Sequence, residues 1–232
     1  MVKVFAVGVG PGSPKYLTDI VNETILNSDI VIGYKYTLKT IEGLIKNKEV
    51  YEVTMQNQEE VYQKVAKTLG NKTCVVPFTG DVNFSESEVV DRLIEIFGDL
   101  QIIPGISSIQ VAASKAKIPL DKSKVITMHV STSIEEKQLE LQKALIDGYS
   151  VILVPRPWPK EPSKHFMQSE IAMYLRNHGF DTENIKVHVF EFLTSDKETH
   201  FIGTLKDLEG KQFSDLSVMV FDQTKLESYV NF

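Results

Sequence analysis

The sequence predicts an α/β protein made of two α/β domains, the first with a mostly parallel sheet and the second with a mixed sheet. Short apolar runs alternate with amphipathic stretches through the first half, which is the pattern of α/β architecture. Beyond residue 124, three strand-like runs follow one another with little helix between them. With 232 residues, the chain is long enough for two domains that each bury a core.

The first half contains five apolar runs that predict strands. Predicted strands are Val2–Val9, Asp29–Gly33, Glu49–Val53, Thr73–Phe78 and Leu100–Ile103. Predicted helices are Leu17–Asn27, Glu59–Leu69, Val89–Phe97 and Ser107–Lys117. The second of these helices has apolar residues at Val61, Val65 and Leu69, the spacing of one helix face. We therefore expect a first domain over residues 1–117.

The second half begins after a polar stretch, residues 118–124, whose proline and charges predict a linker. Predicted strands are Val125–Val130, Ser150–Val154, Ile185–Leu193, Thr199–Leu205 and Leu216–Phe221. Predicted helices are Glu135–Ile146 and Glu170–Asn177, the latter ending at Gly179. The second domain is expected over residues 124–232.

Charge and composition narrow the class of protein. The net charge of −6 argues against a general nucleic-acid-binding surface. Because no apolar stretch approaches the length of a membrane span and the N-terminus lacks the features of a signal peptide, we expect a cytoplasmic protein without a membrane partner. Cys74, the only cysteine, lies in an apolar run and predicts a buried, inert thiol. The histidine spacing fits no zinc helix, so no metal site is expected.

The first informative loop, Gly8–Thr18, follows the first strand directly. Its glycines allow a sharp turn and close approach of a ligand. A nicotinamide dinucleotide site needs glycine where this chain has Ser13, a helix where it has Pro14, and an acidic residue where it has Tyr34. The dinucleotide interpretation therefore fails, and a plain strand-to-helix turn stays open beside a ligand site.

Two further loops follow the fourth and fifth strands. One carries Gly80 and Asp81, and the other carries Ser107 and Ser108. Asp81 suits either a hydroxyl-rich or cationic ligand or the cap of the next helix or turn, and the serines suit a helix cap or the same crevice. Because ligands bind beyond the carboxyl ends of parallel strands, the three loops together predict one site.

The three loops, taken in order, resemble the tetrapyrrole methylase family. That family's pattern is similar to Gly-x-Gly-Pro-Gly-x-x-x-x-Leu-Thr, then Gly-Asp-Pro, then Pro-Gly-Ile-Ser-Ser. This chain matches the first pattern at Gly8–Thr18 and the third at Pro104–Ser108. Val82 replaces the proline of the second. The run Glu191–Glu198 with Gly203–Leu205 further resembles the members that methylate carbon 5 of a corrin precursor, with Phe192 in place of Asn. The Gly-Arg that usually follows the histidine at His129 is missing.

The resemblance implies two α/β domains with S-adenosyl-L-methionine in the cleft between them, usually in a homodimer. It implies that the loop at Gly8–Gly12 faces the substrate cleft. The implied cofactor-binding residues are Gly8, Gly10, Pro11, Gly80, Asp81, Val82, Phe84, Ser107, Ser108, Ile109, Val154 and Pro155. No certain catalytic residue is assigned, because transfer from an activated donor mainly requires alignment of two carbons.

A corrin precursor carries many carboxylates, which an acidic protein has to offset locally. Candidates for substrate binding are Gly12, Lys35, Lys39, Arg156, Lys160 and Lys164, with His165 beside them. Trp158 suits packing on a flat macrocycle or on its own domain.

The expected function is therefore methylation of carbon 5 at the (cobalt-)precorrin-7 stage of cobalamin biosynthesis, with decarboxylation left to a possible separate decarboxylating methyltransferase partner. Alternatives that stay open are methylation of another corrin carbon, diphthine synthase, an rRNA methyltransferase, and a non-catalytic module that binds a nucleotide or a tetrapyrrole.

Overall fold

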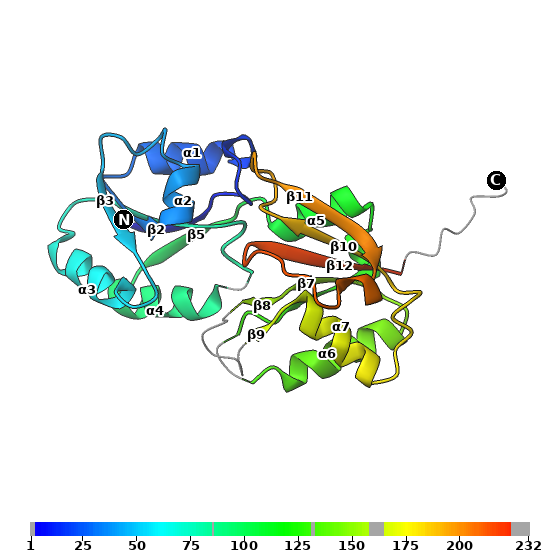
Figure 1. Cartoon of the computed structure of the whole chain (residues 1–232). Helices are drawn as coiled ribbons and strands as arrows, with labels where there is room; N and C mark the ends of the chain where they lie inside the picture. The colour runs from blue at the N-terminus through cyan, green and yellow to red at the C-terminus, as the bar shows by residue number, and fades with distance from the viewer. Residues whose placement is uncertain (1–2, 85, 131–132, 158–164, 224–232) are drawn as a thin grey trace. The chain divides into compact units, whose positions relative to one another are not determined.

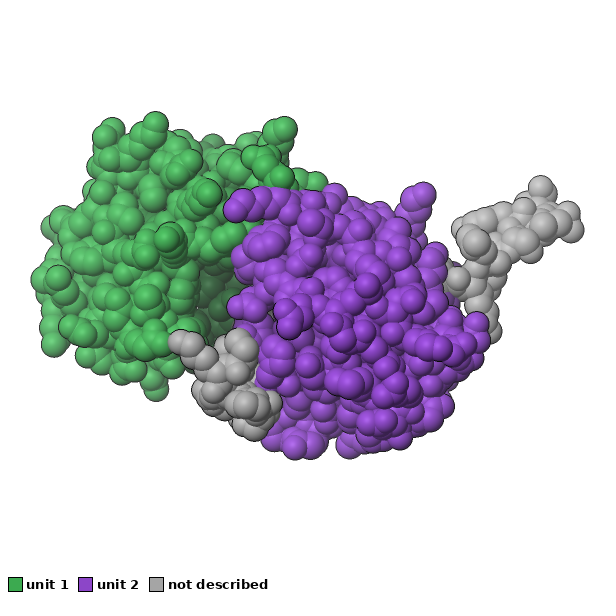
Figure 2. Space-filling model, in the orientation of Figure 1, with its two compact units in different colours: residues 1–108, 194–196 green, residues 109–193, 197–232 purple. Residues whose placement is uncertain are grey.

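The computed structural model describes residues 3–84, 86–130, 133–157 and 165–223. The chain divides by its contacts into two compact units. Unit 1 consists of Met1–Ser108 with Thr194–Asp196, and unit 2 of Ile109–Leu193 with Lys197–Phe232 (Figure 2).

Unit 1 is built on a five-stranded, all-parallel sheet in the order β3-β2-β4-β1-β5. Its strands are β1 Val4–Gly8, β2 Ile30–Tyr34, β3 Glu49–Val53, β4 Cys74–Phe78 and β5 Leu100–Ile103. Its helices are α1 Asp19–Leu26, α2 Lys35–Thr40, α3 Gln58–Thr68 and α4 Ser87–Phe97 (Figure 1).

Both faces of this sheet are covered, which explains why its strands are apolar runs without alternation. Ala6, Ile32 and Val76 point to the face packed against α3 and α4. Val7 and Val31 point to the opposite face, against α1 and α2. All carboxyl ends of a parallel sheet lie at one edge, so the loops that follow β1, β4 and β5 meet there.

Unit 2 has a mixed five-stranded sheet in the order β11-β10-β12-β7-β6, in which only β6 and β7 are parallel. Its strands are β6 Ser123–Thr127, β7 Ser150–Val154, β10 Lys186–Glu191, β11 Thr199–Thr204 and β12 Ser217–Asp222. Its helices are α5 Ser108–Ala116, α6 Glu135–Ile146 and α7 Gln168–Asn177. Two further strands of two residues each, β8 Arg156–Pro157 and β9 His165–Phe166, pair antiparallel as the β8–β9 hairpin.

The core of unit 2 lies between this sheet and α6 and α7, while α5 lies on the other side of the sheet (Figure 1). Leu141 and Leu145 of α6 and Leu175 of α7 are buried in that core. They stand on the inner faces of their helices and meet Val189 and Met219 of the sheet.

The predicted fold class is confirmed, with a parallel first sheet and a mixed second one. The sequence did not predict α2 or the β8–β9 hairpin, and the strand predicted at Val125–Val130 is found as Ser123–Thr127. Contacts divide the chain at Ser108 and Ile109, whereas the predicted linker at 118–124 holds a short 3-10 helix, Leu120–Lys122. A domain boundary in that linker stays a prediction. Within the described ranges, no helix is both long and apolar enough to cross a membrane.

Candidate functional site

The three predicted loops of unit 1 follow β4, β1 and β5, which are neighbours in the sheet. The glycine-rich loop pairs with the loop after β4 through two backbone hydrogen bonds. Gly80 N donates to Gly10 O at 2.7 Å, and Gly10 N donates to Gly80 O at 3.2 Å. Both residues have a left-handed backbone, with φ of 76° at Gly10 and 73° at Gly80, which explains the requirement for glycine at these two positions.

The end of β1 and the loop after β5 come so close that neither Gly8 nor Gly105 has room for a side chain. A Cβ added at Gly8 would lie 2.6 Å from Gly105 N and 2.6 Å from Gly80 O. A Cβ at Gly105 would lie 2.6 Å from Gly80 O and closer still to Gly8 O. Three glycines therefore bring three backbone segments into contact, an arrangement that the family pattern of separate motifs does not reveal.

Asp81 connects the second loop to the third. One carboxylate oxygen accepts the Gly105 N–H at 2.8 Å, and the other accepts the Asn83 N–H at 2.9 Å. The second bond closes a local turn of the kind that aspartate favours. Helix α4 begins at Ser87 with Glu86 as its cap residue, so Asp81 supports the turn and not the helix.

The other residues predicted to line the cofactor differ in what they can offer a ligand. Val82 is 1% exposed and packs into the core of unit 1, which leaves only its backbone for contacts. Pro11 and Ile109 are buried, whereas Gly12, Phe84, Ser107 and Ser108 are partly exposed. A Cβ at Gly80 would lie 3.5 Å from Ser108 N, so the start of α5 adjoins the bridge between the first two loops.

Helix α2 places two of the predicted substrate-binding cations. Lys35 and Lys39 are exposed and four residues apart, hence on one face of the helix. The Thr40 hydroxyl at the end of α2 lies 3.4 Å from Gly12 O and 3.3 Å from Tyr36 O, so it shares its proton between them and brings the helix against the glycine-rich loop. Two cations therefore stand on an element that contacts the candidate site.

A cluster of titratable groups that the sequence did not reveal lies among β2, α3 and α4. The Tyr34 hydroxyl donates to Gln58 Oε1 at 2.9 Å, and Tyr62 is 1% exposed. Burial raises the pKa of Glu86 to about 7. Burial is also the main cause that raises the pKa values of Tyr34 and Tyr62, and the Glu86 charge adds to both. The Arg92 charge acts on both tyrosines in the opposite direction.

In unit 2, the predicted residues lie beyond the parallel pair β6 and β7. Val154 is partly exposed and its carbonyl accepts the Met128 N–H at 2.8 Å, while Pro155 is buried. Arg156, a predicted substrate-binding cation, is 2% exposed, so its guanidinium is buried. Burial lowers the pKa of His129, and the Arg156 charge lowers it further.

Three other residues, Lys160, Lys164 and Trp158, lie outside the described part of the chain. His165 in β9 is partly exposed and stands 3.8 Å from the Glu170 carboxylate.

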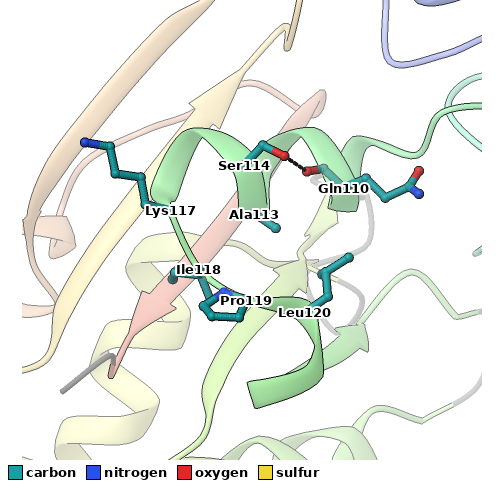
Figure 3. A pocket seen from close by; sticks show the side chains of 7 residues that line it. All are labelled: Gln110, Ala113, Ser114, Lys117, Ile118, Pro119 and Leu120. Carbon is teal, nitrogen blue, oxygen red and sulfur yellow. Dashed lines mark hydrogen bonds between the residues drawn. The ribbon is translucent and has the colours of Figure 1, made fainter. Parts of the chain in front are cut away.

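A pocket in unit 2 is lined by Gln110, Ala113, Ser114, Lys117, Ile118, Pro119 and Leu120. Figure 3 shows that these residues belong to α5 and the turn after it, where Ser114 donates to Gln110 O at 2.9 Å. This pocket contains none of the predicted site residues.

Two expectations about chemistry concern cysteine and metal. Cys74 is fully buried, as predicted, and burial raises its pKa to about 12. Among the described residues there is no group of three or more His, Cys, Asp or Glu that could hold a metal ion.

The class of this protein is defined by its two units. The first has a parallel sheet whose glycine loops converge at one edge, and the second has a mixed sheet. The sequence matches the Tetrapyrrole (Corrin/Porphyrin) Methylases over residues 3–209, so the chain belongs to this family.

Curated relatives and a solved structure agree with this assignment. The chain is 30% identical over 223 residues to the "Probable cobalt-precorrin-7 C(5)-methyltransferase" of Methanocaldococcus jannaschii, covering 94% of this chain and 97% of that protein. It is 28% identical to the "Cobalt-precorrin-4 C(11)-methyltransferase" of the same organism, covering 90% and 81%. The solved structure of the methyltransferase CobJ has the same fold, with a TM-score of 0.78 at 17% identity over 95% of this chain and 94% of that one.

Proposed function

We propose that this chain transfers a methyl group from S-adenosyl-L-methionine to carbon 5 of a corrin precursor at the (cobalt-)precorrin-7 stage of cobalamin biosynthesis. One observation carries the choice of carbon: the 30% identical relative, which matches over nearly the full length of both chains, bears the name of that activity. The resemblance of Glu191–Glu198 and Gly203–Leu205 to the same group of enzymes supports it.

The residues of unit 1 suit this cofactor. Ser107 and Ser108 offer hydroxyls, Asp81 offers a carboxylate, and the bare backbone at the glycines permits close approach of a ligand. When bound, S-adenosyl-L-methionine would supply an activated methyl group for in-line attack by an electron-rich ring carbon. The chain's own contribution is alignment: bonds from Asp81 and the Gly10–Gly80 bridge hold the loops rigid, so that donor and acceptor meet in one geometry.

The carboxylates of the corrin would be met first by Lys35 and Lys39 on α2. Both lysines are exposed on the helix whose Thr40 contacts the glycine-rich loop, in a chain of net charge −6. Charge reversal at Lys35 or Lys39 should raise the KM for the corrin roughly 3- to 10-fold, since an exposed charge pair contributes about 1 kcal/mol. Lys67→Glu removes an exposed cation from the end of α3 and is the matched control.

Product mapping tests the proposal. The full chain is incubated with corrin intermediates and carbon-13 methyl-labelled donor, and the product is examined by mass spectrometry and NMR. A label at carbon 5 is expected. A label at carbon 11, the position named for the 28% identical relative, would move the chain to that sister activity. Transfer to protein or RNA, with none to any tetrapyrrole, would overturn the proposal and leave the family assignment standing.

Three accompanying proposals concern the setting of this reaction. We expect a cytoplasmic homodimer. Sedimentation across micromolar concentrations tests the dimer, and a monomer at all concentrations would refute it. We also expect decarboxylation of the corrin to need a separate methyltransferase. To test that expectation, the corrin is incubated with this chain alone and the mass of the product is measured. The product is expected to retain every carboxyl carbon.

A further inference from the structure

The glycine-rich loop is held at its far end by a residue from a distant part of the sequence. Ser13 N donates a hydrogen bond to Thr194 Oγ1 at 2.9 Å, across 181 positions of the chain. Thr194 belongs to unit 1 together with Ser195 and Asp196. The contact therefore lies within one compact unit and joins the first motif of the sequence to the Glu191–Glu198 run.

The backbone around Thr194 is unusual. Phe192 has φ 48° and Thr194 has φ 66°, the left-handed region that β-branched and bulky residues rarely adopt. Such conformations are strained and persist only where surrounding contacts determine them. A turn with two such residues needs specific support.

That support is present just before and just after the turn. The Glu191 carboxylate accepts the Ser214 N–H at 2.6 Å through one oxygen and the Thr199 hydroxyl at 2.6 Å through the other. Phe192 N donates to Leu216 O at 2.9 Å. These bonds fix the strand ends from which the turn departs, and they support its strained backbone at Phe192.

The N–H that donates to Thr194 belongs to Ser13, which stands between the glycines of the loop and the 3-10 helix Pro14–Tyr16. The Ser13 carbonyl accepts the Tyr16 N–H at 3.0 Å within that helix, so the bond to Thr194 is made where the glycine segment ends. Gly10 and Gly12 have φ of 76° and 152°, conformations open to glycine, which leave the chain flexible. The Gly80 bridge holds the loop at Gly10, and Thr40 reaches Gly12 O at 3.4 Å. The Thr194 hydroxyl is the acceptor at Ser13, directly after these glycines.

We propose that Thr194 is a positioning residue that holds residues Gly10–Ser13 in the conformation required for binding the corrin. This inference rests on the proposed function in one respect only, the identity of the ligand that meets the loop. Thr194 acts through the backbone of Ser13 and makes no contact with the reacting atoms.

A conservative series tests the acceptor side. Thr194→Val keeps the shape and β-branching of the side chain, and hence the backbone strain, but removes the acceptor. It should raise the KM for the corrin roughly 3- to 10-fold with kcat nearly unchanged, the effect of losing one hydrogen bond. Thr194→Ser restores the hydroxyl and should return KM to the wild-type value.

A second pair of variants tests the donor side. Ser13→Pro removes the N–H, whereas Ser13→Ala keeps it and removes only the side-chain bond to Lys15 N. If the bond is the cause, Thr194→Val should add nothing to the effect of Ser13→Pro. Independent, additive effects of the two substitutions would contradict the proposal.

Hydrogen exchange separates this inference from the proposed function, because it requires no substrate. The Ser13 amide should exchange roughly 10-fold faster in Thr194→Val than in the wild type, with Thr194→Ser and Ser13→Ala unchanged. That result would support the positioning role even if the wild type methylated no corrin. Unchanged exchange at Ser13 in Thr194→Val would overturn the role, whatever the product mapping shows.

Discussion

In unit 1, the candidate-site glycines make their contacts through the backbone, whereas in unit 2 the residues that stand out, Arg156 and His129, do so through their side chains. Gly8, Gly80 and Gly105 bring three backbone segments together and leave no room for a Cβ at Gly8 or Gly105. In unit 2, Arg156 is a buried charged group and His129 is a partly exposed titratable one. Backbone contacts of this kind demand glycine and so leave a recognisable pattern in the sequence. Buried polar side chains leave none, because their partners come from distant residues.

The largest effect is expected where the backbone contact is tightest. Gly105→Ala should destabilise the protein by about 3 kcal/mol or more, because the new Cβ meets backbone atoms of Gly8 and Gly80 that cannot rotate away. Gly43→Ala is the control, since a Cβ there meets nothing within 4 Å. Urea unfolding measures both, and equal stability of the two variants would show that the three loops are not closely packed.

A second effect depends on pH and comes from a side chain of unit 1. Burial raises the pKa of Glu86 from its ordinary value of 4.5 to about 7. Between these values the unfolded chain loses the proton and the folded chain keeps it, so stability falls as pH rises from 4.5 to 7 and is level above. Glu86→Gln, which cannot ionise, should therefore add up to about 3 kcal/mol at pH 8 and almost nothing at pH 4.

The matched control for this variant is Glu95→Gln, an exposed carboxyl on the same helix. Urea unfolding at both pH values should show no pH-dependent difference between Glu95→Gln and the wild type. If Glu86→Gln behaved like Glu95→Gln, the Glu86 carboxyl would have to be solvated, and the cluster with Tyr34 and Tyr62 would not exist.

A third prediction concerns the carboxylate that joins two of the loops. Asp81→Ala loses the bonds to Gly105 N and Asn83 N, so stability should fall by about 2 kcal/mol. Cofactor affinity should fall as well, because the loop after β5 loses its connection to the loop after β4. Asp99→Ala, at an exposed position before β5, is the control. Calorimetry measures the affinity and urea unfolding the stability. If Asp81→Ala changed neither, Asp81 would not connect the two loops.

The smallest effect is expected in unit 2, on the pKa of His129. Because the Arg156 charge lowers the pKa of this histidine, Arg156→Met should raise it towards its ordinary value. Burial also lowers the pKa and stays in place, so the rise should be incomplete. Arg176→Met, an exposed arginine on α7, should leave the pKa unchanged. An NMR titration of His129 that shows no difference among the three proteins would mean that Arg156 lies far from it.

Most of the fold could be predicted because buried parallel strands are apolar runs, as at Cys74–Phe78. Helix α2 could not, since Lys35–Thr40 has only six residues, contains two threonines and shows no apolar repeat. The β8–β9 hairpin has two residues per strand, too few for any alternating pattern.

The sequence marks the candidate site mainly where the site depends on glycine. The sequence places Gly8, Gly10 and Gly80 in loops, but it does not show that these loops touch. The raised pKa of Glu86 comes from tertiary burial, and the Ser13–Thr194 bond spans 181 positions, so neither leaves a local signal. Arg156 was predicted to bind substrate carboxylates, and no local pattern shows that its side chain is buried.

The central claim is that the glycine loops of unit 1 hold a methyl donor, and calorimetry with S-adenosylhomocysteine, its demethylated product, tests it most directly. The wild-type chain should bind this ligand at one site per chain, and NAD should not compete, because Ser13, Pro14 and Tyr34 stand where a dinucleotide site needs other residues. No heat of binding at millimolar S-adenosylhomocysteine, or displacement of the ligand by NAD, would contradict the claim.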